Sequence, residues 1–170
     1  MPRLCFDVIQ CLSTFPDDAQ ARREAERLPN AIWGHQFDNT VNRQYHYLTT
    51  GPEIWAQTNG RIDAWTVATG TGGMDFIIPV QLSIFCTIVK IGTYAGVSEF
   101  LKTKNKNIQC ILADPPGSVL YSWFKEGKLE RSGSSITEGI GQGRVTENLK
   151  GAPVDDAIRV EDEKTIAMLF

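Results

Sequence analysis

Short apolar segments separated by polar, turn-forming residues predict several strands along the chain. Residues 62–69 form the clearest of these segments, because they are largely apolar, include Trp65 and Val67, and stop abruptly at Gly70. A second buried strand is predicted at 108–113, directly before the turn sequence Asp-Pro-Pro-Gly at 114–117. Shorter strands are predicted at 31–33 and 157–160.

Helical periodicity lies between these strands. Ala21, Ala25 and Leu28 recur at helical spacing within residues 19–28, and Asp17 and Asp18 suit the start of that helix. Further helices are expected at 40–57, despite Gly51 and Pro52, at 93–104, and from 161 to 170. Strands that alternate with helices of this length indicate an α/β fold in which helices flank a parallel sheet.

Composition and charge exclude several functional classes. The chain has 170 residues, 42% of them hydrophobic and 22% charged, which is ordinary for a globular domain. A formal net charge of −3 supplies no basic surface for a nucleic acid. The most apolar stretch, residues 76–89, falls short of the roughly 20 residues of a membrane-spanning helix, so we expect a soluble chain without a membrane partner.

Cysteine and histidine spacing gives no metal site. Cys5, Cys11, Cys86 and Cys110 form no Cys-x-x-Cys pair, which favours a reducing compartment over a disulfide framework. His35 and His46 have no neighbouring ligand at zinc-binding spacing, and we interpret both as polar surface residues.

Two glycine-rich stretches are candidates for chemistry. Gly70-Thr71-Gly72-Gly73 follows the strand at 62–69, and a helix after such a loop would present unpaired N–H groups to a phosphate. A tight strand-to-helix turn explains the same residues equally well. Asp75 stands where the dinucleotide fingerprint needs glycine, and no P-loop lysine closes the loop. Residues 133–144, which end at Arg144, could line an anion or substrate pocket or form a surface loop.

Five motifs occur in a single order and carry a family resemblance. They begin at Gln36-Phe37-Asp38-Asn39 and Thr49-Thr50-Gly51-Pro52-Glu53-Ile54-Trp55, and continue with Gly70–Gly73, Asp114-Pro115-Pro116-Gly117-Ser118 and Glu138-Gly139-Ile140-Gly141. Together they resemble cysteine synthase (O-acetylserine sulfhydrylase), a pyridoxal-phosphate enzyme of the tryptophan synthase β type with fold type II. The resemblance implies a remnant of an N-terminal domain at 16–40 and an incomplete cofactor-binding domain at 41–170, with residues 1–15 unmatched.

The resemblance also implies roles for individual residues. Gly70, Thr71, Gly72, Gly73 and Thr93 would hold the phosphate of pyridoxal 5′-phosphate. Gln36, Gly139 and Ile140 would line the substrate pocket, the last two in the segment beside the cofactor ring. The implied reaction replaces the acetate of O-acetylserine with sulfide to make cysteine, in a cytoplasmic or mitochondrial homodimer.

Two departures from the family pattern limit what we expect of the chain alone. None of its eight lysines lies in the Ser-Val-Lys-Asp-Arg type of setting that bears the family's Schiff base, and the family's serine facing the pyridine nitrogen is also missing. We therefore expect a fragment truncated at both ends, with no catalytic residue of its own and little activity. The alternative is a non-catalytic subunit that pairs with a full-length homologue.

Residues 74–92 interrupt the phosphate motif. Joining Gly73 to Thr93 restores the sequence Gly-Thr-Gly-Gly-Thr-Tyr-Ala-Gly, whereas the intervening residues follow neither a helical nor a strand period. We predict that this insert is translated intron or an equivalent error in the gene model. We also expect it to form an apolar surface loop and to separate the glycine loop from the following helix.

Overall fold

The computed structural model describes residues 18–70, 84–137 and 139–168, and the chain divides into two compact units, residues 1–35 and 36–170. The first unit contains helix α1 (Asp18–Arg27), which carries an exposed Arg22–Glu26 ion pair of 2.8 Å one turn apart. The predicted strand at 31–33 is wrong: these residues pair with none of the described strands, and the Ile32 side chain is 89% exposed. A three-residue apolar run forms a strand only where a neighbouring backbone pairs with it.

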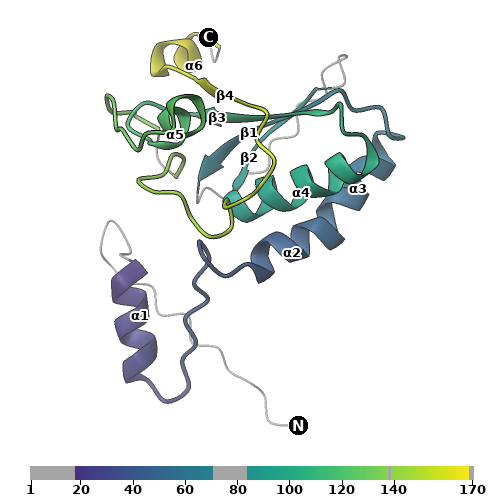
Figure 1. Ribbon diagram of the computed structural model, residues 1–170. Coiled ribbons are helices and arrows are strands. Elements are labelled where there is room, and N and C mark those ends of the chain that lie inside the picture. Colours follow the sequence, from purple (N-terminus) through teal and green to yellow (C-terminus); the bar gives the residue numbers. More distant parts are fainter. Residues whose placement is uncertain (1–17, 71–83, 138, 169–170) are drawn as a thin grey trace. The chain divides into compact units, whose positions relative to one another are not determined.

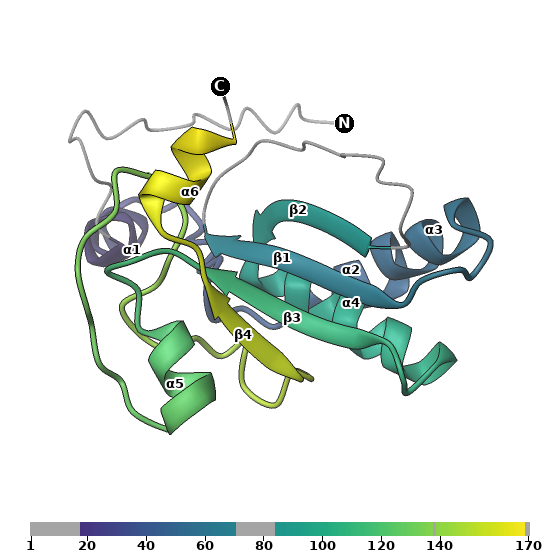
Figure 2. The same ribbon diagram turned by 90° about the horizontal axis from the view of Figure 1, so that it is seen from above.

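The second unit is built on a parallel sheet, which confirms the predicted α/β class. Among the described residues the sheet has four strands in the order β2-β1-β3-β4, and every adjacent pair is parallel. The predicted strands at 62–69, 108–113 and 157–160 correspond to three of these (Figures 1 and 2). The strands are β1 (Ala64–Gly70), β2 (Ile84–Lys90), β3 (Gln109–Asp114) and β4 (Asp156–Arg159).

Helices α2 (Val41–Leu48), α3 (Thr50–Gln57) and α4 (Ile91–Lys104) lie on one face of the sheet (Figures 1 and 2). The single helix expected at 40–57 is wrong, because the chain breaks at Thr49. Pro52 has no N–H and its ring would clash with the carbonyl four residues earlier, so it is accommodated in the first turn of a new helix. Helix α5 (Leu120–Glu126) was not predicted from the sequence, while α6 (Asp162–Ala167) lies within the helix predicted at 161–170.

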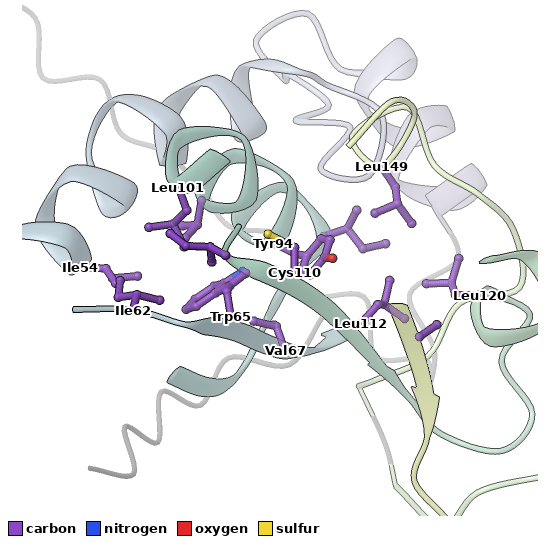
Figure 3. Close-up of a cluster of buried hydrophobic side chains, with 14 residues drawn as sticks. Ile54, Ile62, Trp65, Val67, Tyr94, Leu101, Cys110, Leu112, Leu120 and Leu149 are labelled. Carbon is purple, nitrogen blue, oxygen red and sulfur yellow. The ribbon is translucent and has the colours of Figure 1, made fainter. Parts of the chain in front are cut away.

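The hydrophobic core lies between the sheet and these helices. Trp65, Val67 and Leu112 point from β1 and β3 toward α4, where Tyr94 and Leu101 meet them (Figure 3). All five side chains are at most 1% exposed. Leu120 and Leu149 extend the same core alongside Leu112 (Figure 3). This packing fixes the carboxyl ends of β1 and β3 relative to the start of α4.

Part of the interrupting segment belongs to the sheet. Residues 84–90 form β2, which pairs with β1 over its whole length, from Ala64 opposite Ile84 to Gly70 opposite Lys90. Helix α4 begins at the next residue, Ile91. The prediction of a surface loop is therefore wrong for residues 84–92, because the backbone of β1 provides hydrogen-bonding partners that no sequence period reveals. The rest of the predicted insert, residues 74–83, lies outside the described residues.

Candidate functional site

The candidate site begins at the carboxyl end of β1, where Gly70 contacts a distant part of the chain. Gly70 forms an isolated antiparallel bridge with Ile140, and a Cβ atom added to Gly70 would lie 1.9 Å from the Gly139 carbonyl oxygen. Only glycine allows so close a backbone approach. The structure thus brings together three residues that the family resemblance assigned to one site, whereas Thr71, Gly72, Gly73 and Glu138 lie outside the described residues.

The segment that crosses Gly70 is held in place by the turn after β3. The Ser118 hydroxyl accepts a hydrogen bond from the Gln142 N–H (2.9 Å) and donates one to the Gln142 carbonyl (3.1 Å). Gly141 has a φ of +83°, and a Cβ there would lie 2.9 Å from Pro115. The motifs at 114–118 and 138–141 therefore form one supporting structure at the edge of the site.

Helix α4 starts at this same edge and supplies the second part of the site. In the first turn of an α-helix the N–H groups have no partner within the helix, so they favour an anion. Thr93 lies in this turn and is 8% exposed, and its Oγ1 is 2.9 Å from Nε2 of His46. The interpretation of His46 as a surface residue is wrong: its ring is half-buried and its Nδ1 is 2.8 Å from Thr50 Oγ1. Its i,i+4 spacing from Thr50 could have indicated this contact.

Gly92 is a further site residue that was not predicted from the sequence. It directly precedes Thr93, as the third glycine does in the uninterrupted motif, yet the prediction placed it inside the insert. A Cβ on Gly92 would lie 2.5 Å from the side-chain amide of Asn42 on α2. The glycine–threonine pair at the start of the helix is thus present in the structure, with Gly92 in place of Gly73.

Gln36 is brought near the start of α4 through its backbone. Its carbonyl oxygen accepts hydrogen bonds from Nδ2 of Asn42 (3.1 Å) and from Nδ2 of Asn148 (3.2 Å), and the Gln36 residue is exposed. Asn148 is fully buried and also donates to the Phe37 carbonyl at 2.8 Å. Asn42, which packs on Gly92, therefore connects the Gln36 backbone to the start of α4.

The second glycine-rich stretch lines a cavity of about 310 Å³ beside the turn at 116–118. Arg144, at the end of the predicted pocket segment, does not line it, because its guanidinium binds both carboxylate oxygens of Asp38 at 2.9 and 2.5 Å. The cationic side chain that lines the cavity is Arg131. Asp162 of α6 holds this loop by accepting hydrogen bonds from Ser135 Oγ (2.5 Å) and the Ile136 N–H (2.8 Å).

Asp114 is a buried acid at the end of β3. It is 1% exposed, and one carboxylate oxygen accepts the Tyr121 N–H at 2.8 Å. Burial raises the pKa of the Asp114 carboxyl, against the opposing effect of the hydrogen bond from the Tyr121 N–H and of the Arg159 charge. Because Asp114 accepts an N–H from the first turn of α5, it stabilises the start of that helix after the turn at 114–118. We therefore assign Asp114 to the structural support of the site.

The donor set at this edge fits a phosphate group. The N–H groups of the first turn of α4 and the Thr93 hydroxyl can serve as neutral donors of the kind that bind phosphate monoesters, and Gly70 and Gly92 let a ligand approach the backbone closely. Within the described residues, no group of three or more His, Cys, Asp or Glu side chains could hold a metal ion. No helix among the residues placed by the structure is long and apolar enough to cross a membrane.

Several known proteins are similar to this chain in sequence. The family model described as "Pyridoxal-phosphate dependent enzyme" matches residues 6–75. Cysteine synthase 1 of Neurospora crassa is 53% identical over 156 residues, covering 89% of this chain and 36% of that protein. Cysteine synthase 1 of Emericella nidulans is 49% identical, with coverage of 89% and 37%. The chain thus spans little more than a third of the length of these relatives.

Solved structures share the fold at lower identity. The O-acetylserine dependent cystathionine β-synthase from Helicobacter pylori superposes with a TM-score of 0.65 and 23% identity, covering 86% of this chain and 39% of that one. A hydrogen sulfide-producing enzyme from Fusobacterium nucleatum gives a TM-score of 0.64 and 20% identity, with coverage of 88% and 42%. These likenesses confirm the fold.

Proposed function

We propose that this chain belongs to the pyridoxal-phosphate dependent enzymes of the cysteine synthase type and is part of an enzyme that makes cysteine from O-acetylserine and sulfide. The observation that carries this proposal is the meeting of Gly70 with Gly139 and Ile140 beside the first turn of α4. Two motifs far apart in the sequence, at Gly70 and at Gly139 and Ile140, thus meet at the edge of the sheet where α4 begins. The family resemblance assigns the first to the cofactor phosphate and the second to the substrate pocket beside the cofactor ring.

In this proposal the chain binds the phosphate of pyridoxal 5′-phosphate. The N–H groups of the first turn of α4 and the Thr93 hydroxyl donate to it, together with the backbone of Gly70, Thr71, Gly72 and Gly73. When bound, the cofactor supplies an electron-withdrawing ring that stabilises negative charge on the substrate. The segment at Gly139 and Ile140 lies against the ring and positions it.

Gln36 completes the proposed substrate pocket. Its main chain is fixed by the amides of Asn42 and Asn148, while the residue itself remains exposed. Because the backbone is already fixed, only the side-chain rotamers of Gln36 have to be ordered when a small polar substrate binds. O-Acetylserine, with a carboxylate and an ester, has the hydrogen-bond acceptors that a glutamine amide recognises.

We further propose that the intact enzyme is a homodimer that binds small molecules and neither nucleic acid nor membrane, in the cytoplasm or the mitochondrion. The net charge of −3 supports the absence of nucleic acid. The Saccharomyces cerevisiae protein named "Putative mitochondrial cysteine synthase", 37% identical to this chain over 153 residues, supports the second compartment.

A second candidate function is that of a non-catalytic subunit that pairs with a full-length homologue. It is favoured by the face of the sheet that points away from α4, where Ile111 is half-buried and Ile158 is 39% exposed. Stable co-purification with the intact enzyme would support this function, and a chain that elutes alone from a mixture with that enzyme would exclude it.

Cofactor titration tests the first proposal. Pyridoxal 5′-phosphate added to the purified chain should bind saturably and be displaced by inorganic phosphate, whereas pyridoxal without its phosphate should not bind. Thr93→Val should weaken binding about tenfold, which is the effect of one hydrogen bond to a charged group. Thr103→Val, an exposed position on the same helix, is the matched control. Borohydride should trap no lysine adduct. Binding that phosphate does not displace would contradict the proposal.

A further inference from the structure

His46 lies between two threonine hydroxyls that come from different elements. Its Nδ1 is 2.8 Å from Oγ1 of Thr50, one turn further along the chain, and its Nε2 is 2.9 Å from Oγ1 of Thr93 on α4. Both ring nitrogens are therefore engaged. The imidazole connects the start of α3 to the first turn of α4.

Close packing of α2 against α4 fixes this arrangement. A Cβ on Gly96 would lie 2.3 Å from the Arg43 carbonyl oxygen and 2.7 Å from the Tyr47 N–H nitrogen. A glycine at this position lets the two helix backbones approach directly, one turn from Thr93. The His46 ring, in the last turn of α2, is thereby held at a set distance from the Thr93 hydroxyl.

The direction of these hydrogen bonds decides whether Thr93 can bind an anion. A threonine hydroxyl has one proton, and if it donates that proton to His46, none remains for a ligand that only accepts. If Nε2 carries the ring proton, Thr93 Oγ1 accepts it and the hydroxyl proton is free for a phosphate oxygen. Nδ1 must then accept the hydroxyl proton of Thr50. One tautomer of His46 therefore prepares Thr93 as a donor.

We propose that His46 is a positioning residue, which donates from Nε2 to Thr93 and so directs the Thr93 hydroxyl proton toward the phosphate group of the bound ligand. This inference rests on the proposed function, since it assumes a phosphate at the start of α4. Thr50 takes part by selecting the tautomer: its hydroxyl donates to Nδ1 and leaves the ring proton on Nε2.

Paired substitutions test this role. The amide of His46→Gln reaches the position of Nε2 and can still donate to Thr93, whereas the shorter amide of His46→Asn reaches only the position of Nδ1. With inorganic phosphate and pyridoxal 5′-phosphate as probes, we expect His46→Asn to weaken binding about tenfold and His46→Gln to restore it to within about threefold of the native chain. A purely structural role would not produce this order.

The outcomes separate this inference from the proposed function. If the native chain binds phosphate and His46→Asn binds it equally well, the inference is overturned and the proposed function stands. If the native chain binds no phosphate, both fail. Nitrogen-15 NMR of the His46 ring in the native chain gives an independent result should a variant not fold: a proton on Nε2 with phosphate present supports the inference, and a neutral ring protonated on Nδ1 overturns it.

Discussion

Gly70 and Lys90 lie opposite each other at the carboxyl ends of two adjacent parallel strands, β1 and β2. Neighbouring strands are about 4.8 Å apart, so the chain that leaves the sheet at Gly70 returns to the same edge twenty residues later. Helix α4 begins immediately after Lys90. The segment between Gly70 and Gly92 therefore starts and ends at the same edge of the sheet.

Deletion of residues 74–92 should restore the proposed phosphate loop. It removes the edge strand β2 and Ile91, but the pairing of β1 with β3 and of β3 with β4 remains, and Gly73 takes the place of Gly92 before Thr93. Three extended residues span about 10 Å, so Thr71, Gly72 and Gly73 are long enough to join the end of β1 to Thr93. We expect the deletion variant to bind pyridoxal 5′-phosphate at least tenfold more tightly, because the loop and helix N–H groups then act on one anion. Calorimetric titration measures this change.

The same deletion combined with Thr93→Val is the matched control and should lose most of the gain. A folded deletion variant with unchanged affinity would contradict the prediction, as would loss of the circular dichroism spectrum of a folded chain. Sequencing of the mature transcript tests the intron hypothesis directly, since abundant message that encodes 74–92 would refute it.

Gly70→Ala should destabilise the fold by about 1–3 kcal/mol, as overpacking does elsewhere. The added methyl would lie 1.9 Å from the Gly139 carbonyl oxygen, a backbone atom that can move only if the segment from 139 to 142 shifts. Gly143→Ala is the control, because there a Cβ meets only the end of the flexible Arg131 side chain, at 2.9 Å. Urea unfolding compares the two, and equal losses would contradict the assigned contact.

Asn148→Asp should cost about 3 kcal/mol or more in the free energy of unfolding. The Asn148 amide donates to the carbonyl oxygens of Gln36 and Phe37, and a buried carboxylate in its place would face two acceptors without a proton to donate. Asn107→Asp, at an exposed position, should change stability by less than about 0.5 kcal/mol. Thermal unfolding measures both, and a mild effect at Asn148 would mean that other groups hold Gln36.

Asp155 should contribute stability that is lost in acid. Partial burial by itself raises the pKa of the Asp155 carboxyl, but the Cys110 N–H at 2.7 Å and the Lys102 ammonium at 2.6 Å lower it overall. The unfolded chain, in which Asp155 has the ordinary carboxyl pKa of about 4, then binds the proton more readily than the folded chain. The free energy of unfolding therefore falls as the pH drops below about 4 and continues to fall until the pH has passed the lowered pKa of the folded chain.

Asp155→Asn should remove this part of the pH dependence. Unfolding curves recorded from about pH 7 down to about pH 2 would show a flatter acid limb for the variant than for the native chain, with Asp63→Asn as an exposed control. An identical slope in Asp155→Asn and the native chain would contradict the prediction.

Local patterns along the chain were sufficient to predict most of the elements and their class. The apolar runs at 62–69 and 108–113 correspond to β1 and β3, and the helical stripe at 93–104 corresponds to most of α4. These elements could be predicted because the spacing of apolar side chains within one run indicates by itself that the run is buried and which period it follows. The glycine at the end of β1 was also identified from the sequence, since an abrupt Gly-rich stop after a strand is a local signal.

Contacts between distant segments were decided by the tertiary structure alone. β2 has no periodicity of its own and exists because β1 offers a free edge of N–H and C=O groups. His46 reaches Thr93 across 47 residues because two helices cross at a glycine, and no pattern within either helix encodes that distance. The sequence by itself therefore determined the elements, the α/β class and the family resemblance, whereas the neighbours of each site residue depended on how backbones far apart in the chain pack and pair.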